Sequence, residues 1–505
     1  MFCKIKSAAI HGVEMKEINV EVDISDGLPS FDMVGLLNSE VKESRERVRT
    51  AVKNIGIAIP PKRITVSLSP ANVRKMGNFF DLPIAIGILK SLGVVGERDF
   101  KDTVIIGELS LDGHVNPIEG VITIVYDGLL KGYRRFIVPK ENAKEGCVVE
   151  GAMVYGVESL KDAIDLINND FDRECEKINI EKIIESYVEE IADFADISGH
   201  ELAKRAAIIA ACGMHHMLLV GPPGSGKSML ASRIRGIMPK PNIDECIEIT
   251  KNHSVAGKIN GKPLIIERPF SAPHHTVTEP ALIGGGGIPR PGEISLAHKG
   301  VLFLDELAEF RNDTIDVLRE PLENGKISIS RINGVYDFPA SFMLVAATNP
   351  CKCGYYPDRT RCNCTEYQVK NYLGRISGPI LDRIDMCVSM QGINIEELTS
   401  ENKGMPTDEM KAIIQKGRNM QIKRYKNFQT FNGKIQSKDI KKFCLIDKSA
   451  NEILNMAYKK LRLSARSYNK VLKVARTIAD IDESEMIEKR HIAEALGYRF
   501  DSLYK

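Results

Sequence analysis

The sequence lacks long apolar runs and a strong charge of either sign. Residues 1–23, MFCKIKSAAIHGVEMKEINVEVD, contain no unbroken apolar segment of the kind that directs secretion, and no stretch approaches the length of a membrane span. The 69 Lys and Arg residues nearly balance the 67 Asp and Glu residues, which leaves a net charge of +2. We therefore expect a cytoplasmic protein with no membrane contact, in which any contact with nucleic acid comes from local basic patches.

Cysteine is sparse, with 11 residues spread over a chain of 505. Because the number is odd and a secretion signal is lacking, this usage favours thiols or metal ligands over a disulfide framework. The sequence also shows no internal repeat and no low-complexity tail. A chain of this length exceeds one typical core, so we expect two or three domains.

Four segments of different pattern divide the chain. Residues 1–165 interleave short β-like runs with helical stretches, which is typical of an α/β domain. Residues 166–195 are charged and glycine-free, which predicts a mainly helical linker. Residues 196–395 alternate apolar strands with helices, as a parallel sheet requires, and residues 396–505 have a helical pattern.

A nucleotide-binding loop is the clearest motif. The segment HHMLLVGPPGSGKSML places an apolar strand before G-x-x-x-x-G-K-S and a helix after it. Glycines let backbone N–H groups face phosphate oxygens, and the helix N-terminus adds its positive dipole end. Lys227 would neutralise the terminal phosphates, and the Ser228 hydroxyl would bind Mg²⁺. The predicted nucleotide-binding residues are Gly221, Pro222, Pro223, Gly224, Ser225, Gly226, Lys227 and Ser228.

Two acidic residues follow the apolar run at 301–304. Alone, Asp305-Glu306 could equally cap a helix. With a nucleotide-binding loop upstream, they favour ATP hydrolysis, since carboxyl ends of parallel strands meet at one edge of the sheet. Asp305 would hold Mg²⁺, and Glu306 would act as the general base for the attacking water.

The motifs GPPGSGKS, LFLDE and VAATN, in this order, resemble those of AAA+ ATPases, in which Asn349 would be the sensor-1 residue. Residues 268–310, RPFSAPHHTVTEPALIGGGGIPRPGEISLAHKGVLFLDELAEF, resemble the ComM (YifB) family in the Mg-chelatase-like branch. This resemblance implies an AAA+ P-loop parallel-sheet core with a helical lid, and it implies ATP and Mg²⁺ as cofactors.

Two arginine positions also follow from the resemblance. The segment YLGRISGPILDRIDM is similar to the motif that carries the arginine finger, which assigns this role to Arg383, with Arg375 as the second candidate. The segment LSARSYNKVLKVART resembles the sensor-2 helix of the lid, with Arg466 reaching the γ-phosphate. By residue type alone, either arginine could simply be solvated or ion-paired.

A hairpin is predicted between the acidic residues and sensor 1. Alternation in NGKISISRINGVYDFPASF around Asn333-Gly334 predicts two strands joined by a two-residue turn. The hairpin resembles the insertion shared by magnesium chelatases and the MCM replicative helicases. Lys326, Arg331 and the glycine loop at 284–287 are the candidates for DNA contact at a central pore.

The N-terminal segment resembles the Lon protease domain, a ribosomal S5-domain-2-like α/β fold, in GELSLDGHVNPIEGV and KGYRRFIVPKENAKE. Lon-type proteolysis needs a serine nucleophile and a lysine. Phe79, Phe80 and Asp81 stand in the serine segment, and Ile124 stands where the lysine is expected, so we predict a non-proteolytic relative. A basic cluster here is either a nucleic-acid contact or a solvated helix face; its members are Arg45, Arg47, Arg49, Lys53, Lys62, Arg63, Arg74 and Lys75.

Four of the cysteines lie together, in NPCKCGYYPDRTRCNC. Cys351, Cys353, Cys362 and Cys364 could hold a structural Zn²⁺ with four thiolates. The spacing C-x-C is less usual than C-x-x-C, so free reduced thiols and a redox disulfide stay open as alternatives.

The family resemblance implies a ring of identical subunits, a hexamer, that couples ATP hydrolysis to movement along single-stranded or branched DNA. Within the family this is a branch-migration helicase of recombination and natural transformation. One alternative is a chelatase-type motor that remodels a protein partner during Mg²⁺ insertion; the Lon-like domain and the lack of a D-x-S-x-S motif at the end weigh against it. The other is an ATP-binding switch or scaffold, against which Glu306 and the finger weigh.

Overall fold

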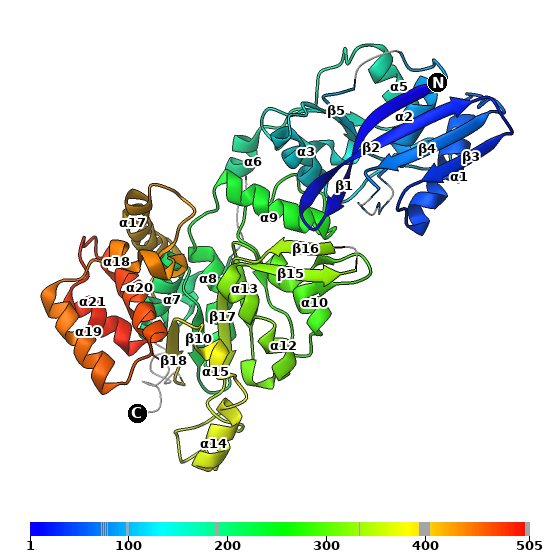
Figure 1. Cartoon of the computed structure of the whole chain (residues 1–505). Coiled ribbons are helices and arrows are strands. Elements are labelled where there is room, and N and C mark those ends of the chain that lie inside the picture. The colour runs from blue at the N-terminus through cyan, green and yellow to red at the C-terminus, as the bar shows by residue number, and fades with distance from the viewer. Residues whose placement is uncertain are drawn as a thin grey trace.

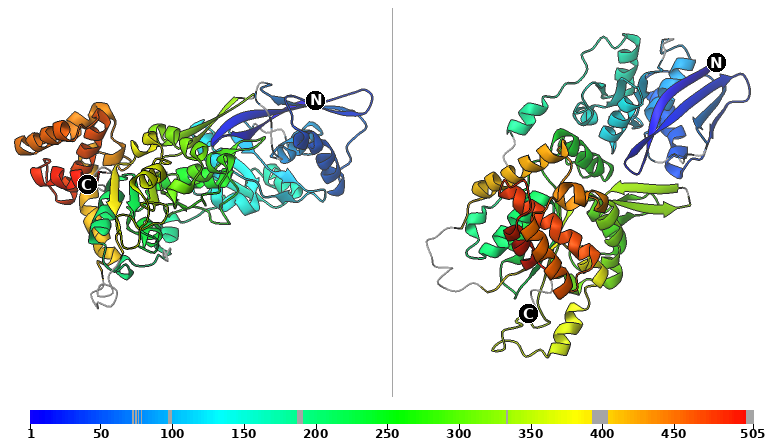
Figure 2. Two further views of the ribbon diagram at one scale, coloured as in Figure 1. Left: turned by 90° about the horizontal axis from the view of Figure 1, so that it is seen from below. Right: turned by 60° about the vertical axis from the view of Figure 1, so that its left-hand side comes forward.

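The computed structural model describes residues 1–505 except 72, 74, 76, 78, 97–99, 187–190, 333, 393–403 and 500–505. An N-terminal α/β part and a C-terminal helical part lie on either side of a central core (Figure 1). The views of Figure 2 show the same elongated order. The predicted α/β fold with a parallel-sheet core is confirmed, whereas the predicted domain boundaries stay a prediction.

The N-terminal part contains a twisted four-stranded sheet in the order β1-β2-β4-β3 and a parallel three-stranded sheet in the order β5-β8-β9. The long β1–β2 hairpin was not predicted, because its apolar residues alternate with charged ones and form no continuous apolar run. Helix α2 is buried along almost its whole length and packs against β1 and β2. The main elements are β1 (Phe2–His11), β2 (Glu14–Ser25), β3 (Ser30–Val34), α1 (Ser39–Asn54), β4 (Arg63–Ser69), α2 (Asp81–Ser91), β5 (Thr103–Ile105), α3 (Val121–Leu130), β8 (Arg135–Pro139) and β9 (Met153–Val157).

The central core is a five-stranded parallel sheet in the order β11-β14-β17-β10-β18. Strands β10, β14 and β17 are buried at every position, which explains why they appear in the sequence as continuous apolar runs. Because all five strands are parallel, their carboxyl ends form one edge of the sheet and their amino ends form the other. The strands are β10 (Met217–Val220), β11 (Phe270–Ser271), β14 (Val301–Leu304), β17 (Met343–Thr348) and β18 (Met386–Ser389).

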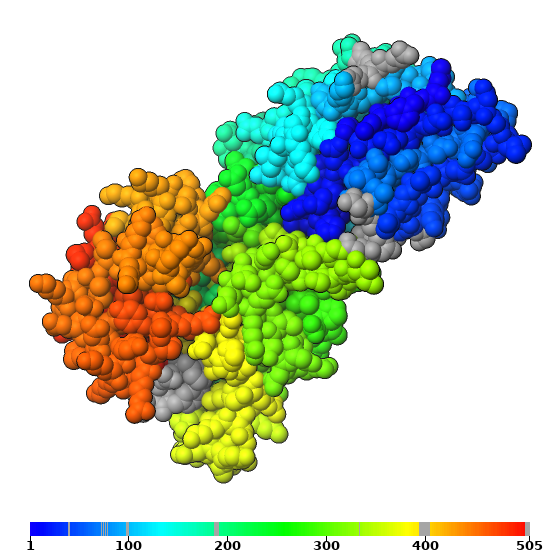
Figure 3. Space-filling model, viewed as in Figure 1, coloured from blue at the N-terminus to red at the C-terminus, as the bar shows by residue number. Residues whose placement is uncertain are grey.

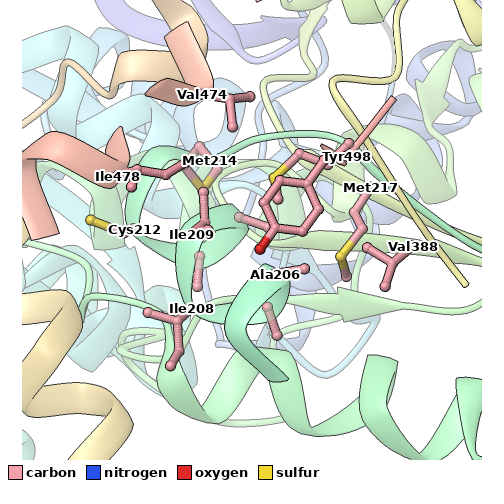
Figure 4. Packing of buried hydrophobic residues seen from close by; sticks show 14 of the residues in the cluster. Ala206, Ile208, Ile209, Cys212, Met214, Met217, Val388, Val474, Ile478 and Tyr498 are labelled. Carbon is pink, nitrogen blue, oxygen red and sulfur yellow. The ribbon is translucent and has the colours of Figure 1, made fainter. Parts of the chain in front are cut away.

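The C-terminal helices share one apolar cluster with the core. Figure 4 shows Met214 and Ile209 of the core near Val474 and Ile478 of the C-terminal part, with Met217 on the side of Val388. This packing fixes α20 relative to the sheet. The helices involved are α7 (Glu201–Gly213), α8 (Lys227–Ile237), α17 (Thr407–Tyr425), α19 (Lys448–Lys460), α20 (Ala465–Ile481) and α21 (Lys489–Gly497). In the described part of the chain, none of the helices combines the length and the apolar character that a membrane crossing needs.

The linker differs from its prediction. Residues 166–168 are the end of α5 (Leu160–Asn168), residues 169–179 are not helical, and α6 (Ile180–Ser186) is the only further α-helix in the described part of the segment. The chain instead runs along the N-terminal part, where Glu176 N–H donates to the carbonyl of Val154 and Arg173 pairs with Asp162 at 3.0 Å. These tertiary contacts outweigh the helix propensity of the charged residues.

The N-terminal part and the core are in direct contact. Ser254 of α9 (Ile243–Val255) accepts a hydrogen bond from the Gly120 N–H at 2.9 Å, and Lys251 pairs with Asp127 at 2.7 Å. The β1–β2 turn meets the hairpin of the core, where the rings of His11 and Tyr336 stack with centroids 3.9 Å apart. In Figure 3 the surface of this hairpin, in light green, adjoins the blue N-terminal part.

Candidate nucleotide site

The predicted phosphate-binding loop connects β10 to α8. Gly224 and Gly226 have φ of 75° and 81°, which glycine adopts without steric cost, and α8 begins at the next residue. The Lys227 ammonium lies inside the loop and donates to the carbonyls of Gly221 and Pro222, both at 2.8 Å. Burial lowers the pKa of Lys227, and the nearby carboxylates of the site oppose this shift. The loop therefore forms a cationic cradle before any phosphate is bound.

The acidic pair lies at the same edge of the sheet. Ser228 Oγ donates to Asp305 Oδ2 at 2.5 Å, although β17 separates their two strands. A hydroxyl and a carboxylate are hard oxygen donors of the kind that Mg²⁺ prefers, so these two residues fit the ion. When bound, Mg²⁺ would offset the negative charge of the phosphates.

Glu306 has a left-handed backbone, with φ of 51°, which is uncommon for a residue with a side chain. Its carboxylate is half exposed and its Oε2 lies 3.4 Å from Nδ1 of His275, whose ring packs on that of His274 at 4.0 Å between centroids. His275 was not predicted as a site residue. The sequence feature that could have indicated it is the pair of histidines in APHHTVTEP, within the segment that carries the family resemblance.

Asn349 completes this edge. It follows β17, and its Oδ1 lies 3.3 Å from the Lys227 ammonium. The structure thus brings together the phosphate-binding loop, both acidic residues and Asn349, as expected for a site that binds and hydrolyses a nucleotide.

Arg383 and Arg466 lie at the opposite edge. Both face Glu323: Arg383 forms an ion pair with it, and Arg466 Nη2 is 3.8 Å from its carboxylate. A cavity of about 640 Å³ lies beside the phosphate-binding loop, whereas the arginines line a separate cavity of about 590 Å³ with His216 and Asp385, which directly precede β10 and β18. Strands of four residues span about 13 Å, so these arginines are not brought to the phosphate-binding loop of their own chain.

Arg375, the second finger candidate, has different surroundings. Its guanidinium is half exposed and lies 3.2 Å from Glu309, three residues after the proposed general base. Arg375 is therefore close to the acidic residues of its own chain.

The predicted hairpin is present, with its turn shifted by one residue. Strands β15 (Lys326–Arg331) and β16 (Gly334–Pro339) pair Arg331 with Gly334, so Gly334 belongs to a strand and the turn contains Ile332. Asn333 lies outside the described residues. Ile332 is fully exposed, which suits a tip that contacts another molecule.

Of the three candidates for DNA contact, Arg331 and the glycine loop are near each other, whereas Lys326 lies at the other end of β15, at the base of the hairpin. Lys326 pairs across the hairpin with Asp337 at 2.9 Å. Arg331 is exposed, and its guanidinium would lie 3.8 Å from a Cβ at Gly285, in the glycine loop. The hairpin and the glycine loop are thus neighbours on one face.

In the N-terminal part, the acidic residue of the segment compared with the Lon serine segment is held in an ion pair. Asp81, the first residue of α2, is buried and binds Arg47, with Arg47 Nε donating to Oδ2 at 2.6 Å. Of the basic cluster, Arg47 is held in this pair, Lys75 is buried, and Lys62 pairs with Asp26 at 3.0 Å. Arg74 lies outside the described residues. The surroundings of Arg47 and Lys75 favour a structural role over DNA contact, whereas Lys62 lies in a surface ion pair.

The four clustered cysteines converge in space. Their sulfurs all lie within 4.8 Å of one another, with 3.3 Å from Cys351 to Cys353 and 3.5 Å from Cys353 to Cys362. A tetrahedral Zn²⁺ with Zn–S distances of about 2.3 Å needs sulfurs about 3.8 Å apart, so the cluster, including Cys364, fits the ion. A hydrogen bond from the Tyr355 backbone lowers the pKa of Cys353 to about 6, which supplies a thiolate at neutral pH.

The cysteine loop touches the nucleotide site. A Cβ at Gly354 would lie only 2.5 Å from Cδ of Pro223 in the phosphate-binding loop. Gly354 has φ of 90°, so both its backbone and its close approach require glycine.

Comparison with known proteins agrees with this geometry. Three family profiles match in succession: "Subunit ChlI of Mg-chelatase" at residues 20–142, "Magnesium chelatase, subunit ChlI" at 193–398, and "Magnesium chelatase, subunit ChlI C-terminal" at 404–499. Competence protein ComM of Haemophilus influenzae is 40% identical over 500 residues, which cover 98% of this chain and 97% of that protein. The chain belongs to the ComM/YifB family of Mg-chelatase-like AAA+ proteins.

YifB of Escherichia coli is 38% identical over 501 residues, 98% of this chain and 96% of its own length. The magnesium-chelatase 67 kDa subunit of Chlorobaculum parvum is 27% identical over 161 residues, which is 31% of this chain and 23% of that subunit. The ComM/YifB likeness thus spans the whole chain, whereas the match to this chelatase subunit covers one part. Membership of an AAA+ family implies the use of ATP and Mg²⁺.

Proposed function

We propose that this protein is a ring-forming ATPase that moves along DNA and promotes branch migration during recombination and natural transformation. The carrying observation is the division of the catalytic residues between the two edges of one sheet. The phosphate-binding loop, the acidic pair and Asn349 share one edge, and Arg383 and Arg466 share the other. A site divided in this way is completed when a second copy of the chain brings its arginines to the nucleotide.

Hydrolysis is assigned to the carboxyl edge. Lys227 binds the terminal phosphates, while Ser228 and Asp305 hold Mg²⁺. Glu306 takes a proton from the attacking water, and the half-exposed position of its carboxylate leaves room for that water. Asn349 lies within hydrogen-bond reach of Lys227, and we assign to it a contact with the terminal phosphate of ATP.

Action on DNA is assigned to the hairpin and the glycine loop. Arg331 is exposed beside that loop, and the fully exposed Ile332 lies at the tip, so the face offers both a cation for phosphate and an apolar group for bases. The name of the Haemophilus relative, a competence protein, is consistent with a role in DNA uptake or recombination.

The ATPase rate with and without DNA tests this function. Full-length protein is assayed alone, with single-stranded DNA, with duplex DNA and with a branched junction of the same sequence. Marked stimulation by single-stranded or branched DNA supports the translocase. If none of these DNAs changes the rate of an active ATPase, the motor acts on a protein partner, as a chelatase-type subunit would, or serves as a nucleotide switch.

We also assign a structural Zn²⁺ to Cys351, Cys353, Cys362 and Cys364. The ion would fix a loop that has only a small apolar core and that contacts Pro223. Metal analysis of protein purified without chelator should find about one zinc per chain, and Cys353→Ser should lower that content while Cys175→Ser should not. Zinc well below one per chain in the parent protein would leave reduced thiols or a disulfide as the explanation.

A further inference from the structure

We propose that Glu323 is an internal substitute for nucleotide phosphate, which holds both arginines of the amino edge until a second copy of the chain presents its bound ATP. The inference rests on the proposed function, because it assumes that Arg383 and Arg466 act on the nucleotide of a neighbour. It adds a regulatory residue that neither a motif nor the family resemblance indicates.

The contacts of the two arginines carry this inference. Arg383 donates to Glu323 through Nη2 and to the Pro379 carbonyl through Nη1 at 2.8 Å, while its buried Nε has no hydrogen-bond partner among the described residues. Arg466 approaches the other carboxylate oxygen of Glu323 at 3.8 Å. One carboxylate is therefore shared by two guanidinium groups from distant parts of the chain, as a phosphate would be.

The cavity around Glu323 has an excess of positive charge, so it favours binding of a further anion. Five cationic side chains and three carboxylates line it: Arg383, Arg466, Lys434, Lys470 and Lys473, with Glu323, Asp382 and Asp385. The lysines are engaged with the protein, since Lys434 donates to the Phe342 carbonyl at 3.0 Å and Lys470 to the Ile384 carbonyl at 2.8 Å. Their charges add to the field, but the two arginines are the groups available to bind a ligand.

Glu323 is also placed to respond to DNA. It lies on α13 (Arg319–Asn324), which ends at Gly325 with φ of 67°, and the next residue, Lys326, begins the hairpin. Helix α13 packs directly on β15. A shift of the hairpin on DNA would therefore move Glu323 and loosen its hold on both arginines.

The test compares the ATPase rates of full-length parent protein, Glu323→Gln and Glu320→Gln, each with and without single-stranded DNA. The Gln variant keeps the size of the side chain but removes the charge that competes with phosphate. We expect its DNA-free rate to rise about twofold to fivefold, the range of exposed ion pairs, and its stimulation by DNA to fall by the same factor. Glu320→Gln removes the same charge one turn earlier on α13 and should behave like the parent.

Glu323→Asp provides a second variant, because it keeps the charge but is too short to reach both arginines; its DNA-free rate should rise as well. Unchanged DNA-free rates in both Glu323 variants, with thermal melting like that of the parent, would overturn the inference. If DNA fails to stimulate the parent but Glu323→Gln still raises the DNA-free rate, the proposed action on DNA is wrong and the restraint by Glu323 stands. If DNA stimulates all proteins equally and the DNA-free rates match, the restraint alone is wrong.

Discussion

The two edges of the central sheet differ in how the sequence builds them. At the carboxyl edge, each contribution is a short motif that directly follows a strand: 221–228 after β10, 305–306 after β14, and Asn349 after β17. At the amino edge, Glu323 and Arg466 come from helices α13 and α20, and Arg383 comes from the turn after α15 (Gly378–Leu381). Ion pairs join these three residues. The first edge joins a lysine, two carboxylates and an amide around one loop, whereas at the second edge two arginines share one carboxylate of the same chain.

The largest effect is expected at the carboxyl edge, from Lys227→Ala. The change removes hydrogen bonds from a charged donor to the phosphates, each worth about 1.5–3 kcal/mol, so two such bonds correspond to a loss of roughly 10²–10⁴ in ATP affinity. Calorimetry with ATP and Mg²⁺ measures this loss. Lys240→Ala, an exposed position beyond α8, should retain affinity. A Kd within threefold of the parent value for Lys227→Ala would remove this residue from the phosphate site.

Glu306→Gln separates binding from hydrolysis at the same edge. The amide cannot accept the proton of water, so turnover should fall about 10²–10⁴-fold while ATP binding is kept. Steady-state ATPase rates and nucleotide retention on gel filtration measure the two properties. Glu309→Gln, three residues later, should keep most of the activity. Parent-like turnover of Glu306→Gln would exclude it as the general base.

Arg383→Ala tests the amino edge. Arginine fingers contribute about 10³–10⁵ in rate in the best-studied NTPases, and we expect a smaller loss of about 10²–10³ here, with ATP binding retained. Arg375→Ala, whose guanidinium pairs with Glu309, should lose much less.

Mixing then decides whether Arg383 acts between subunits. Arg383→Ala and Lys227→Ala each lack a different half of the composite site, so some interfaces of a mixed ring regain a complete one. Partial activity should return when the two inactive variants are mixed and assembled. Co-assembly without any recovery would mean that Arg383 acts within its own subunit or that Arg375 is the finger.

The smallest effect is expected on the DNA-facing hairpin. Each phosphate neutralised contributes about 0.7–0.9 to the slope of log K against log salt, so the joint change Lys326→Ala and Arg331→Ala should lower that slope by roughly one to two units. DNA affinity is measured by fluorescence anisotropy at several salt concentrations. Lys161→Ala with Arg134→Ala, two exposed positions of the N-terminal part outside the basic cluster, is the matched control. Equal slopes for the parent and the hairpin variant would rule out the hairpin as a DNA contact.

The parts of the site that could be predicted from the sequence are those encoded by local patterns. The glycine spacing around Lys227 and the apolar run before Asp305 each carry their structure within about ten residues. The order of the core strands was not predicted, and β17 lies between β10 and β14. Glu323 could not be found in this way, because a glutamate on a short exposed helix has no distinctive pattern and its meaning comes from residues 60 and more positions away. The mainly helical prediction for the linker, residues 166–195, was wrong at 169–179 for a related reason: helix propensity is local, whereas Glu176 and Arg173 are held by tertiary contacts.

The stacking of His11 on Tyr336 supports the hairpin from the side of the N-terminal part. Strands β15 and β16 have six residues each, a length of about 20 Å, but Tyr336 is only the third residue of β16 from the tip. A Cβ at Gly12 would lie 2.7 Å from the Asp337 carbonyl, so the β1–β2 turn rests directly on the backbone there. The part of the hairpin beyond this contact is therefore short, and a force on its tip is transmitted to the N-terminal sheet. His11→Ala should therefore leave a longer part of the hairpin unsupported. Amide hydrogen exchange in 326–339 should then become faster.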